Sequence, residues 1–190
     1  MGGGDKPLRT LAGRTLLAHA IDRVAPQVSA MVLNANGDAA RLAAFGLPII
    51  ADPLPDFPGP LAGILAGLRW AQATHPSATD VLSVPTDTPF LPGDLVARLL
   101  AGRGGQPLAC AASAGWSHPV IGLWPVALAD ALETALRGGE RKIDAFTARH
   151  GIAAIDFAAV PFDPFFNVNR PEDLAAAEAL IALYPTTVRP

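Results

Sequence analysis

The sequence has few of the features that mark secreted, membrane-bound or nucleic-acid-binding proteins. It contains one cysteine in 190 residues, so no disulfide can form within the chain. No apolar run approaches the roughly 20 residues that span a bilayer, and residues 1–6 lack the hydrophobic segment of a signal peptide. Lys and Arg form no run, and the formal net charge is −3. We therefore expect a cytoplasmic protein that binds neither membrane nor nucleic acid.

The composition is that of one globular domain. Hydrophobic residues make up 51% of the chain and charged residues 16%. A chain of this length buries about 70% of the surface that it exposes when unfolded, so it needs no disulfide or structural metal to fold. Cys110 lies in the apolar stretch 108–112, which indicates a buried hydrophobic residue rather than a nucleophile. We expect residues 1–190 to form one monomeric domain.

Helical spacing alternates with short apolar runs along the whole chain. Val24 and Pro26 end a first helix, Asp38 and Gly46 bound a second, and Gly59-Pro60 opens a third. Strands are expected at 30–33, 48–51, 80–84, 108–112, 119–124 and 153–157, with helices between them, at 92–100, 126–136 and 142–150, and after Arg170. This alternation predicts an α/β fold with a mostly parallel sheet, helices on both faces and three layers.

Polar or glycine-rich residues follow several of these strands. In open α/β sheets ligands bind beyond the carboxyl ends of the strands. The segments at that place are 34–36, 52–63, 85–89 and 167–169, and residues 2–6 have the same character with no strand before them. These five segments are therefore the candidate ligand-binding positions.

Lys6 and Asp87 are the candidate phosphate and metal contacts. Three glycines, at 2–4, offer flexible backbone N–H groups and Lys6 offers an ammonium, which together suit a polyphosphate; a disordered tail or a cloning remnant has the same pattern. Asp87 follows an apolar strand and lies between Pro85 and Pro89, which hold it at the edge of the sheet. A carboxylate in that position suits Mg²⁺, and it equally suits a turn that caps the next helix.

Asp52, Gly59 and Gly63 belong to a proline-rich loop that leads into a helix. The two glycines leave room for a flat ring or a sugar against the backbone, and the Asp52 carboxylate can accept hydrogen bonds from a base or a ribose. Close packing of the helix on the sheet explains Gly63 equally well.

The other candidates are amides and cations. Asn167 and Asn169 lie two residues apart on one side of an extended segment, although Asn169 is also placed to cap the last helix. His118 precedes a proline in a polar loop and fits an ordinary turn. Arg141 and Lys142 fit a solvated helix start as well as a phosphate contact.

Taken together, these residues resemble the molybdenum cofactor guanylyltransferases over nearly the whole chain. The shared motifs, in order, are Gly-Asp-Lys at 4–6, Asn34 and Asn36, Asp52, Phe57-Pro-Gly-Pro-Leu-Ala-Gly63, Asp87-Thr-Pro89, His118-Pro119, Gly-Glu-Arg-Lys at 139–142, and Phe166-Asn-Val-Asn169 before Pro171-Glu-Asp173. One such motif is weak, but the set in register is specific.

The resemblance implies a Rossmann-like nucleotidyltransferase that joins GMP from GTP to the phosphate of molybdopterin. It implies that the purine nucleotide binds to the N-terminal half of the chain and the pterin to the C-terminal half. In this view Lys6 contacts the triphosphate and Asp87 is the Mg²⁺ ligand, and both are catalytic. The guanosine pocket would consist of Asn34 or Asn36, Asp52, Gly59 and Gly63, and the pterin phosphate side of Asn167, Asn169, His118, Arg141 and Lys142. Transient contact with cofactor-biosynthesis or acceptor enzymes is also implied.

One feature of that family is missing. Its members carry an apolar strand and a Leu-Ala-Gly-Gly loop ahead of the Gly-x-Asp-Lys segment, and the sequence has neither. We therefore expect the central strand, and half of the phosphate and base cradle, to be absent. Two other functions stay open: a pterin-binding carrier without catalysis, and a nucleotidyltransferase for another phosphorylated substrate.

Overall fold

The computed structural model describes residues 6–54 and 59–185. The helices are α1 (Leu16–Val24), α2 (Pro60–Thr74), α3 (Leu95–Gly102), α4 (Ala129–Arg137), α5 (Ile143–His150) and α6 (Pro171–Leu183). The strands are β1 (Thr10–Leu11), β2 (Arg14–Thr15), β3 (Leu33–Asn34), β4 (Ile49–Ile50), β5 (Asp80–Ser83), β6 (Leu108–Ser113), β7 (Trp116–Pro125) and β8 (Ile152–Asp156). Short 3-10 helices are η1 (Lys6–Leu8), η2 (Ala25–Gln27), η3 (Ala39–Phe45) and η4 (Val126–Leu128).

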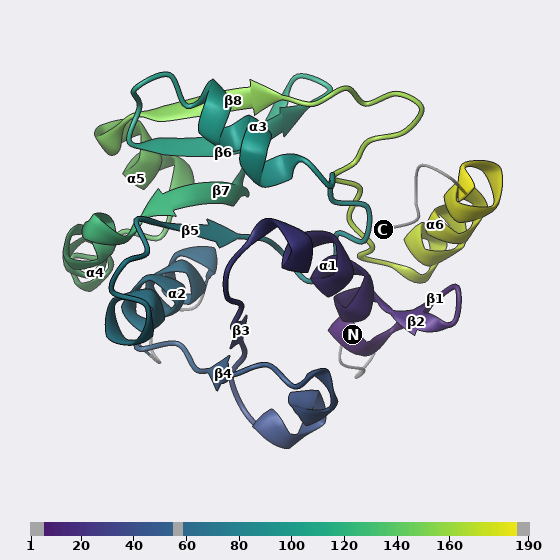
Figure 1. Cartoon of the computed structure of the whole chain (residues 1–190), viewed down its shortest axis with the longest axis horizontal. Helices are drawn as coiled ribbons and strands as arrows, with labels where there is room; N and C mark the ends of the chain where they lie inside the picture. Colours follow the sequence, from purple (N-terminus) through teal and green to yellow (C-terminus); the bar gives the residue numbers. More distant parts are fainter. Residues whose placement is uncertain (1–5, 55–58, 186–190) are drawn as a thin grey trace.

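The main sheet has the strand order β5-β7-β6-β8 (Figure 1). Strand β7 is antiparallel to both β5 and β6, whereas β6 and β8 are parallel, so β5, β6 and β8 share one direction. The expected α/β fold is confirmed, with a sheet that is mixed because of β7. Ala114 and Gly115, with φ of 49° and 82°, form the two-residue connection between β6 and β7. Such a tight turn can join only antiparallel neighbours.

Helices cover both faces of this sheet. Ala109 and Ala111 of β6 pack in a core cluster with α1 and α3, and Leu108 of the same strand packs in another with α2, α4 and α5. Alternate residues of a strand point to opposite faces, so β6 contributes to both cores. Trp124 of β7 and Phe146 of α5 are fully buried in the second cluster. The three layers predicted from the sequence are therefore present.

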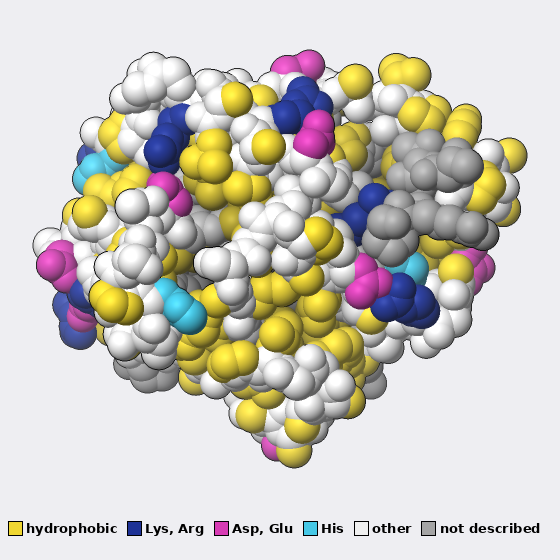
Figure 2. Space-filling view, viewed as in Figure 1, with side chains coloured by type: hydrophobic (Ala, Val, Ile, Leu, Met, Phe, Trp, Pro, Cys, Tyr) yellow, Lys and Arg dark blue, Asp and Glu magenta, His cyan; other side chains and the backbone are white. Residues whose placement is uncertain are grey.

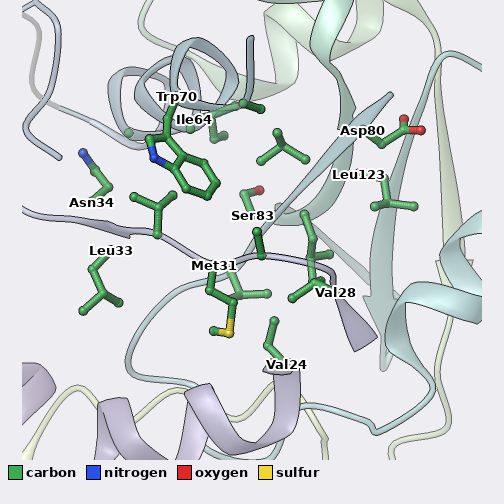
Figure 3. Close-up of a pocket in the computed structure, with 18 of the residues that line it drawn as sticks. Val24, Val28, Met31, Leu33, Asn34, Ile64, Trp70, Asp80, Ser83 and Leu123 are labelled. Carbon is green, nitrogen blue, oxygen red and sulfur yellow. The ribbon is translucent and has the colours of Figure 1, made fainter. Parts of the chain in front are cut away.

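A second, small sheet consists of the parallel pair β3 and β4. It is separated from β5 by a cavity of about 700 Å³, which is bordered by α1 and α2. Figure 3 shows Trp70 and Ile64 of α2 on one side of this cavity, and Met31 and Leu33, from the segment that leads into β3, on the other side. Figure 2 shows hydrophobic side chains gathered on this face of the molecule, over β3 and the space beside it.

Several element bounds differ from those predicted. The helix expected after Asp38 is the 3-10 helix η3, whose start is capped by the Asp38 side chain and whose end is Gly46 with φ of 66°. The strand expected at 30–33 is reduced to Leu33–Asn34, since β3 pairs with β4 alone. Among the described residues, no helix is long and apolar enough to cross a membrane.

The segment between β8 and α6 returns the chain to the end of β5. The Val168 N–H donates to the carbonyl oxygen of Asp87, at 3.0 Å. Val168 is fully buried in a cluster with Leu11, Leu16 and Phe90. This packing brings residues of the C-terminal segment next to the N-terminal segment and to the loop after β5.

Candidate active site

Lys6, Asp87 and Asn169 meet at one point, although they are far apart in the sequence. The Lys6 ammonium forms an ion pair with Oδ2 of Asp87 and donates a hydrogen bond to Oδ1 of Asn169. The side chain of Lys6 is 32% exposed and that of Asp87 is 18% exposed. The site is thus half-buried and open to a ligand from solvent.

The loop after β5 holds Asp87 in place. Its carbonyl oxygen accepts from Val168, and the neighbouring Thr88, which is fully buried, donates from Oγ1 to Oδ1 of Asn167 at 2.7 Å. The next helix, α3, begins only at Leu95, after Asp94. Asp87 therefore does not cap that helix, and its carboxylate contacts Lys6 instead.

Asn169 is held by a turn at the start of α6. Oδ2 of Asp173 accepts from the backbone N–H groups of Asn169 and Arg170, both at 2.8 Å. These hydrogen bonds, that from Arg170 foremost, hold the pKa of Asp173 below its usual range. Because Arg170 is the N-cap residue, the Asn169 amide is not used as a cap and points to Lys6.

Asn34, Asn36 and Asp52 form a second cluster at the carboxyl ends of β3 and β4. Nδ2 of Asn34 lies 2.9 Å from Oδ1 of Asp52, and Nδ2 of Asn36 lies 2.7 Å from Oδ2. Oδ1 of Asn36 accepts from the Asp52 N–H. The pair of amides orients the carboxylate, which is a suitable acceptor for the N–H groups of a base.

The two glycines of the predicted pocket begin helix α2. Gly59 is its N-cap residue, with φ of 133°, a conformation that favours glycine. A Cβ on Gly63 would lie 2.5 Å from Oδ1 of Asn34. The missing side chain at Gly63 is therefore what allows the asparagine cluster to pack against the first turn of α2. Both glycines line the large cavity, as do Asn34 and Asp87.

His118 belongs to a third group that includes two residues not singled out in the sequence. Oγ of Ser113 lies 2.8 Å from Nε2 of His118 and 2.8 Å from Oδ1 of Asp163. Phe165 packs against the His118 ring with centroids 5.1 Å apart. Ser113 gave no signal beyond its place at the end of a strand, and Asp163 lies in a segment where no pattern was recognised.

Arg141 and Lys142 are placed apart from these groups. They lie in the loop between α4 and α5, where both backbone N–H groups donate to Oε1 of Glu140. The Arg141 guanidinium donates to the carbonyl oxygens of Leu136 and Glu140. In Figure 1, α4 and α5 lie on the opposite side of the molecule from α6 and the N-terminal segment.

The oxygen atoms around Asp87 suit a divalent cation that is bound together with a phosphate ligand. Oδ1 of Asp87 is buried and has no hydrogen-bond partner within residues 6–54 and 59–185. The same residues include no group of three or more His, Cys, Asp or Glu that could hold a metal by themselves. Mg²⁺ is commonly bound by one or two carboxylates, with waters and substrate phosphates as the remaining ligands. The residues present fit that mode.

Comparison with known proteins supports a nucleotidyltransferase. The model of the MobA-like NTP transferase domain matches residues 1–153. A molybdenum cofactor guanylyltransferase of Rhodopseudomonas palustris (strain BisB5) is 59% identical over 183 residues, which cover 95% of this chain and 87% of that protein. A protein of the same name from Cereibacter sphaeroides is 48% identical over 95% of this chain and 90% of its own length.

Solved structures show the same fold. Molybdopterin-guanine dinucleotide biosynthesis protein A from Archaeoglobus fulgidus superposes with a TM-score of 0.73, at 24% identity, over 95% of this chain and 92% of its own. The 4-diphosphocytidyl-2C-methyl-D-erythritol synthase from Anaerococcus prevotii superposes with a TM-score of 0.71, at 12% identity, over 94% and 92% of the two chains. At these identities the likeness concerns the fold alone.

Proposed function

Because the chain belongs to the MobA-like NTP transferase family and is a nucleotidyltransferase of molybdenum cofactor biosynthesis, we propose that it transfers GMP from GTP to the phosphate of molybdopterin. The products are molybdopterin guanine dinucleotide and pyrophosphate. The observation that carries this proposal is the meeting of Lys6, Asp87 and Asn169 at the edge of the sheet. An ammonium and a carboxylate with one unpartnered oxygen are what a nucleoside triphosphate with a divalent cation requires.

Each residue has a role in this reaction. Lys6 leaves Asp87 for the triphosphate and neutralises part of its charge, and the Asp87 carboxylate would hold the cation. Mg²⁺, when bound, stabilises the negative charge that develops on the phosphate oxygens. The Asn34, Asn36 and Asp52 cluster, with Gly59 and Gly63, receives the guanosine. The N-terminal half of the single domain thus binds the nucleotide.

The chemistry requires no covalent intermediate on the protein. An oxygen of the molybdopterin phosphate attacks the α-phosphorus of GTP in line, a new P–O bond forms, and the bond to the leaving pyrophosphate breaks with its electron pair. The protein increases the rate by positioning the two substrates and by compensating charge. We assign His118, Asn167 and Asn169 to the pterin side, whereas Arg141 and Lys142, which the resemblance also implied there, lie apart in the loop between α4 and α5. The cytoplasmic setting, the monomeric state and the contacts with other enzymes stay predictions from the sequence.

The test compares two aspartates close in the sequence. Asp87→Ala should lower GMP transfer by about 10² or more, because the carboxylate that shares the cation is lost. Asp94→Ala is the matched control, since the Asp94 side chain makes no capping hydrogen bond to α3. The measurement is pyrophosphate release with GTP, Mg²⁺ and molybdopterin.

Equal turnover in the two variants would contradict the proposal. A titration of the unmodified protein with GTP and Mg²⁺ separates it from the alternatives. Pterin binding without GTP affinity would identify a carrier, and GTP binding without transfer to molybdopterin would indicate another phosphorylated acceptor.

A further inference from the structure

Three polar side chains form a chain that ends at His118. Ser113, the last residue of β6, is fully buried and lies between the other two. Its Oγ is 2.8 Å from Oδ1 of Asp163 and 2.8 Å from Nε2 of His118. The same Oδ1 of Asp163 accepts from the Phe165 N–H at 2.9 Å. A buried hydroxyl with two well-placed partners has no rotational freedom left.

Counting protons fixes the direction of each hydrogen bond. An ionised carboxylate only accepts, so the single proton of Ser113 is donated to Asp163. The Ser113 oxygen must then accept from His118, which requires a proton on Nε2. In a neutral imidazole the other nitrogen, Nδ1, then carries a lone pair and accepts hydrogen bonds. No hydrogen bond to Nδ1 occurs among the described residues, and His118 is only half-buried.

This group lies at the edge of the sheet where Asp87 is found. Ser113 ends β6 and Asp87 follows the end of β5. Both strands are antiparallel to β7 and so run in the same direction, which places the two residues at the same edge of the sheet. The loop 163–169 connects the two places, because Asp163 contacts Ser113 while Val168 and Asn169 contact Asp87 and Lys6. His118 therefore borders the same reaction site from the C-terminal half.

We propose that Ser113 and Asp163 are positioning residues that keep the His118 proton on Nε2, so that Nδ1 accepts a hydrogen bond from an N–H group of the pterin substrate. Pterins carry ring N–H and amino groups, which donate hydrogen bonds. If the His118 proton were on Nδ1, that nitrogen would also be a donor and could not accept from them. The identity of the substrate rests on the proposed function, whereas the position of the proton does not.

The first test is nitrogen-15 NMR of the free protein at about pH 8, above the ordinary pKa of histidine. The chain has four histidines, and the His118→Phe variant identifies the His118 signals by their loss. We expect Nε2 bonded to hydrogen and Nδ1 unprotonated. A proton on Nδ1, in place of or besides that on Nε2, would overturn the proposal.

Two variants of Asp163 separate positioning from simple structural support. In Asp163→Asn the amide oxygen can keep both hydrogen bonds, because Phe165 and Ser113 donate to the same Oδ1, and the tautomer should be retained. In Asp163→Ala the Ser113 hydroxyl is free to donate to His118, so a large part of the signal should move to the tautomer protonated on Nδ1. Circular dichroism and thermal unfolding of both variants show that each is folded; if Asp163→Ala is not, Ser113→Ala replaces it, with loss of the single tautomer expected.

Steady-state kinetics provide the second readout. Asp163→Ala should raise KM for molybdopterin about three- to tenfold, the effect of one lost hydrogen bond, with kcat and KM for GTP nearly unchanged. Asp163→Asn should restore the unmodified value. An equal loss in both Asp163 variants, or an effect on GTP, would contradict the positioning role. If no transfer occurs at all, the proposed function fails, and the NMR result still decides the proton position.

Discussion

At the scale of single residues, the free site is neutralised by its own side chains. The Lys6 ammonium and the Asp87 carboxylate form an ion pair in a half-buried position, where either charge alone would be costly to desolvate. In the proposed reaction, a triphosphate and its cation would provide new partners for both groups, so the ion pair would separate when the ligand binds.

Cys110 provides a prediction on pH. It is 1% exposed, and this burial raises the pKa of its thiol to about 11. The folded protein therefore keeps the thiol proton at pH values where the unfolded chain has lost it. The stabilisation is complete below the ordinary thiol pKa of about 8.5 and is lost as pH rises through about 11.

The free energy of unfolding should therefore fall by about 3 kcal/mol between about pH 8.5 and pH 11 because of this residue. Urea unfolding of the unmodified protein and of Cys110→Ala measures the effect. The variant has no thiol to titrate, so the difference between the two free energies of unfolding at each pH cancels the titrations of the other groups. A difference between the two proteins that is constant over this pH range would contradict the prediction.

At the scale of elements, helix α2 connects the two sheets through two of its glycines. A Cβ on Gly63 would lie 2.5 Å from Oδ1 of Asn34, whereas one on Gly67 would lie 3.5 Å from Cγ1 of Val81. The first distance is a clash and the second is an ordinary van der Waals contact. The two glycines therefore form a matched pair within one helix, with Gly63 next to Asn34 and Gly67 next to Val81 of the main sheet.

Gly63→Ala should push Asn34 away from Asp52 and raise KM for GTP about tenfold, because the carboxylate loses one of the amides that orient it. Gly67→Ala should leave KM unchanged and stabilise the protein by up to about 1 kcal/mol through its better helix propensity. Initial rates at varied GTP and urea unfolding measure both effects. A similar KM in the two variants would show that the asparagine cluster does not contact the nucleotide.

At the scale of the whole molecule, the cavity between β3 and β5 interrupts the layer of strands. Leu33 and Ala35 donate to carbonyl oxygens of Pro48 and Ile50, so the backbone groups of Asn34 point away from β4. The Val126 N–H donates to the carbonyl oxygen of Thr79, so the backbone groups of Thr79 point toward β7. Because backbone groups alternate in direction along a strand, those of Leu82, three residues further on, point away from β7. Two strand edges thus border an apolar cavity that is covered by α1 and α2.

An extended apolar segment placed in this cavity should join the two sheets. We expect that six Val and Ile residues, fused ahead of Met1 through a Gly/Ser linker, stabilise the protein by about 2 kcal/mol, or roughly 4 to 8 °C in Tm. The control is an extension of the same length made of Gly and Ser. Thermal unfolding and hydrogen exchange at Asn34 and Leu82 are the measurements. Equal stability and equal exchange with both extensions would show that the cavity does not accept a strand.

The sequence by itself determined the features that depend on neighbouring residues. Gly59 and Pro60 start α2, Asp38 and Gly46 bound a single short helix, and the apolar stretch around Cys110 is a buried strand. Caps, turns and the spacing of apolar residues act within a few residues, so they can be recognised in the chain alone. The motif set also indicated the family, and the comparisons confirmed it.

Only the tertiary structure decided which distant side chains meet. Lys6 and Asn169 are 163 residues apart, and their contact depends on how the segment after β8 returns to the loop after β5. The direction of β7, the link from Ser113 to His118 and Asp163, and the separate position of Arg141 are likewise results of packing. Such contacts arise from burial summed over the whole core, which no local pattern encodes.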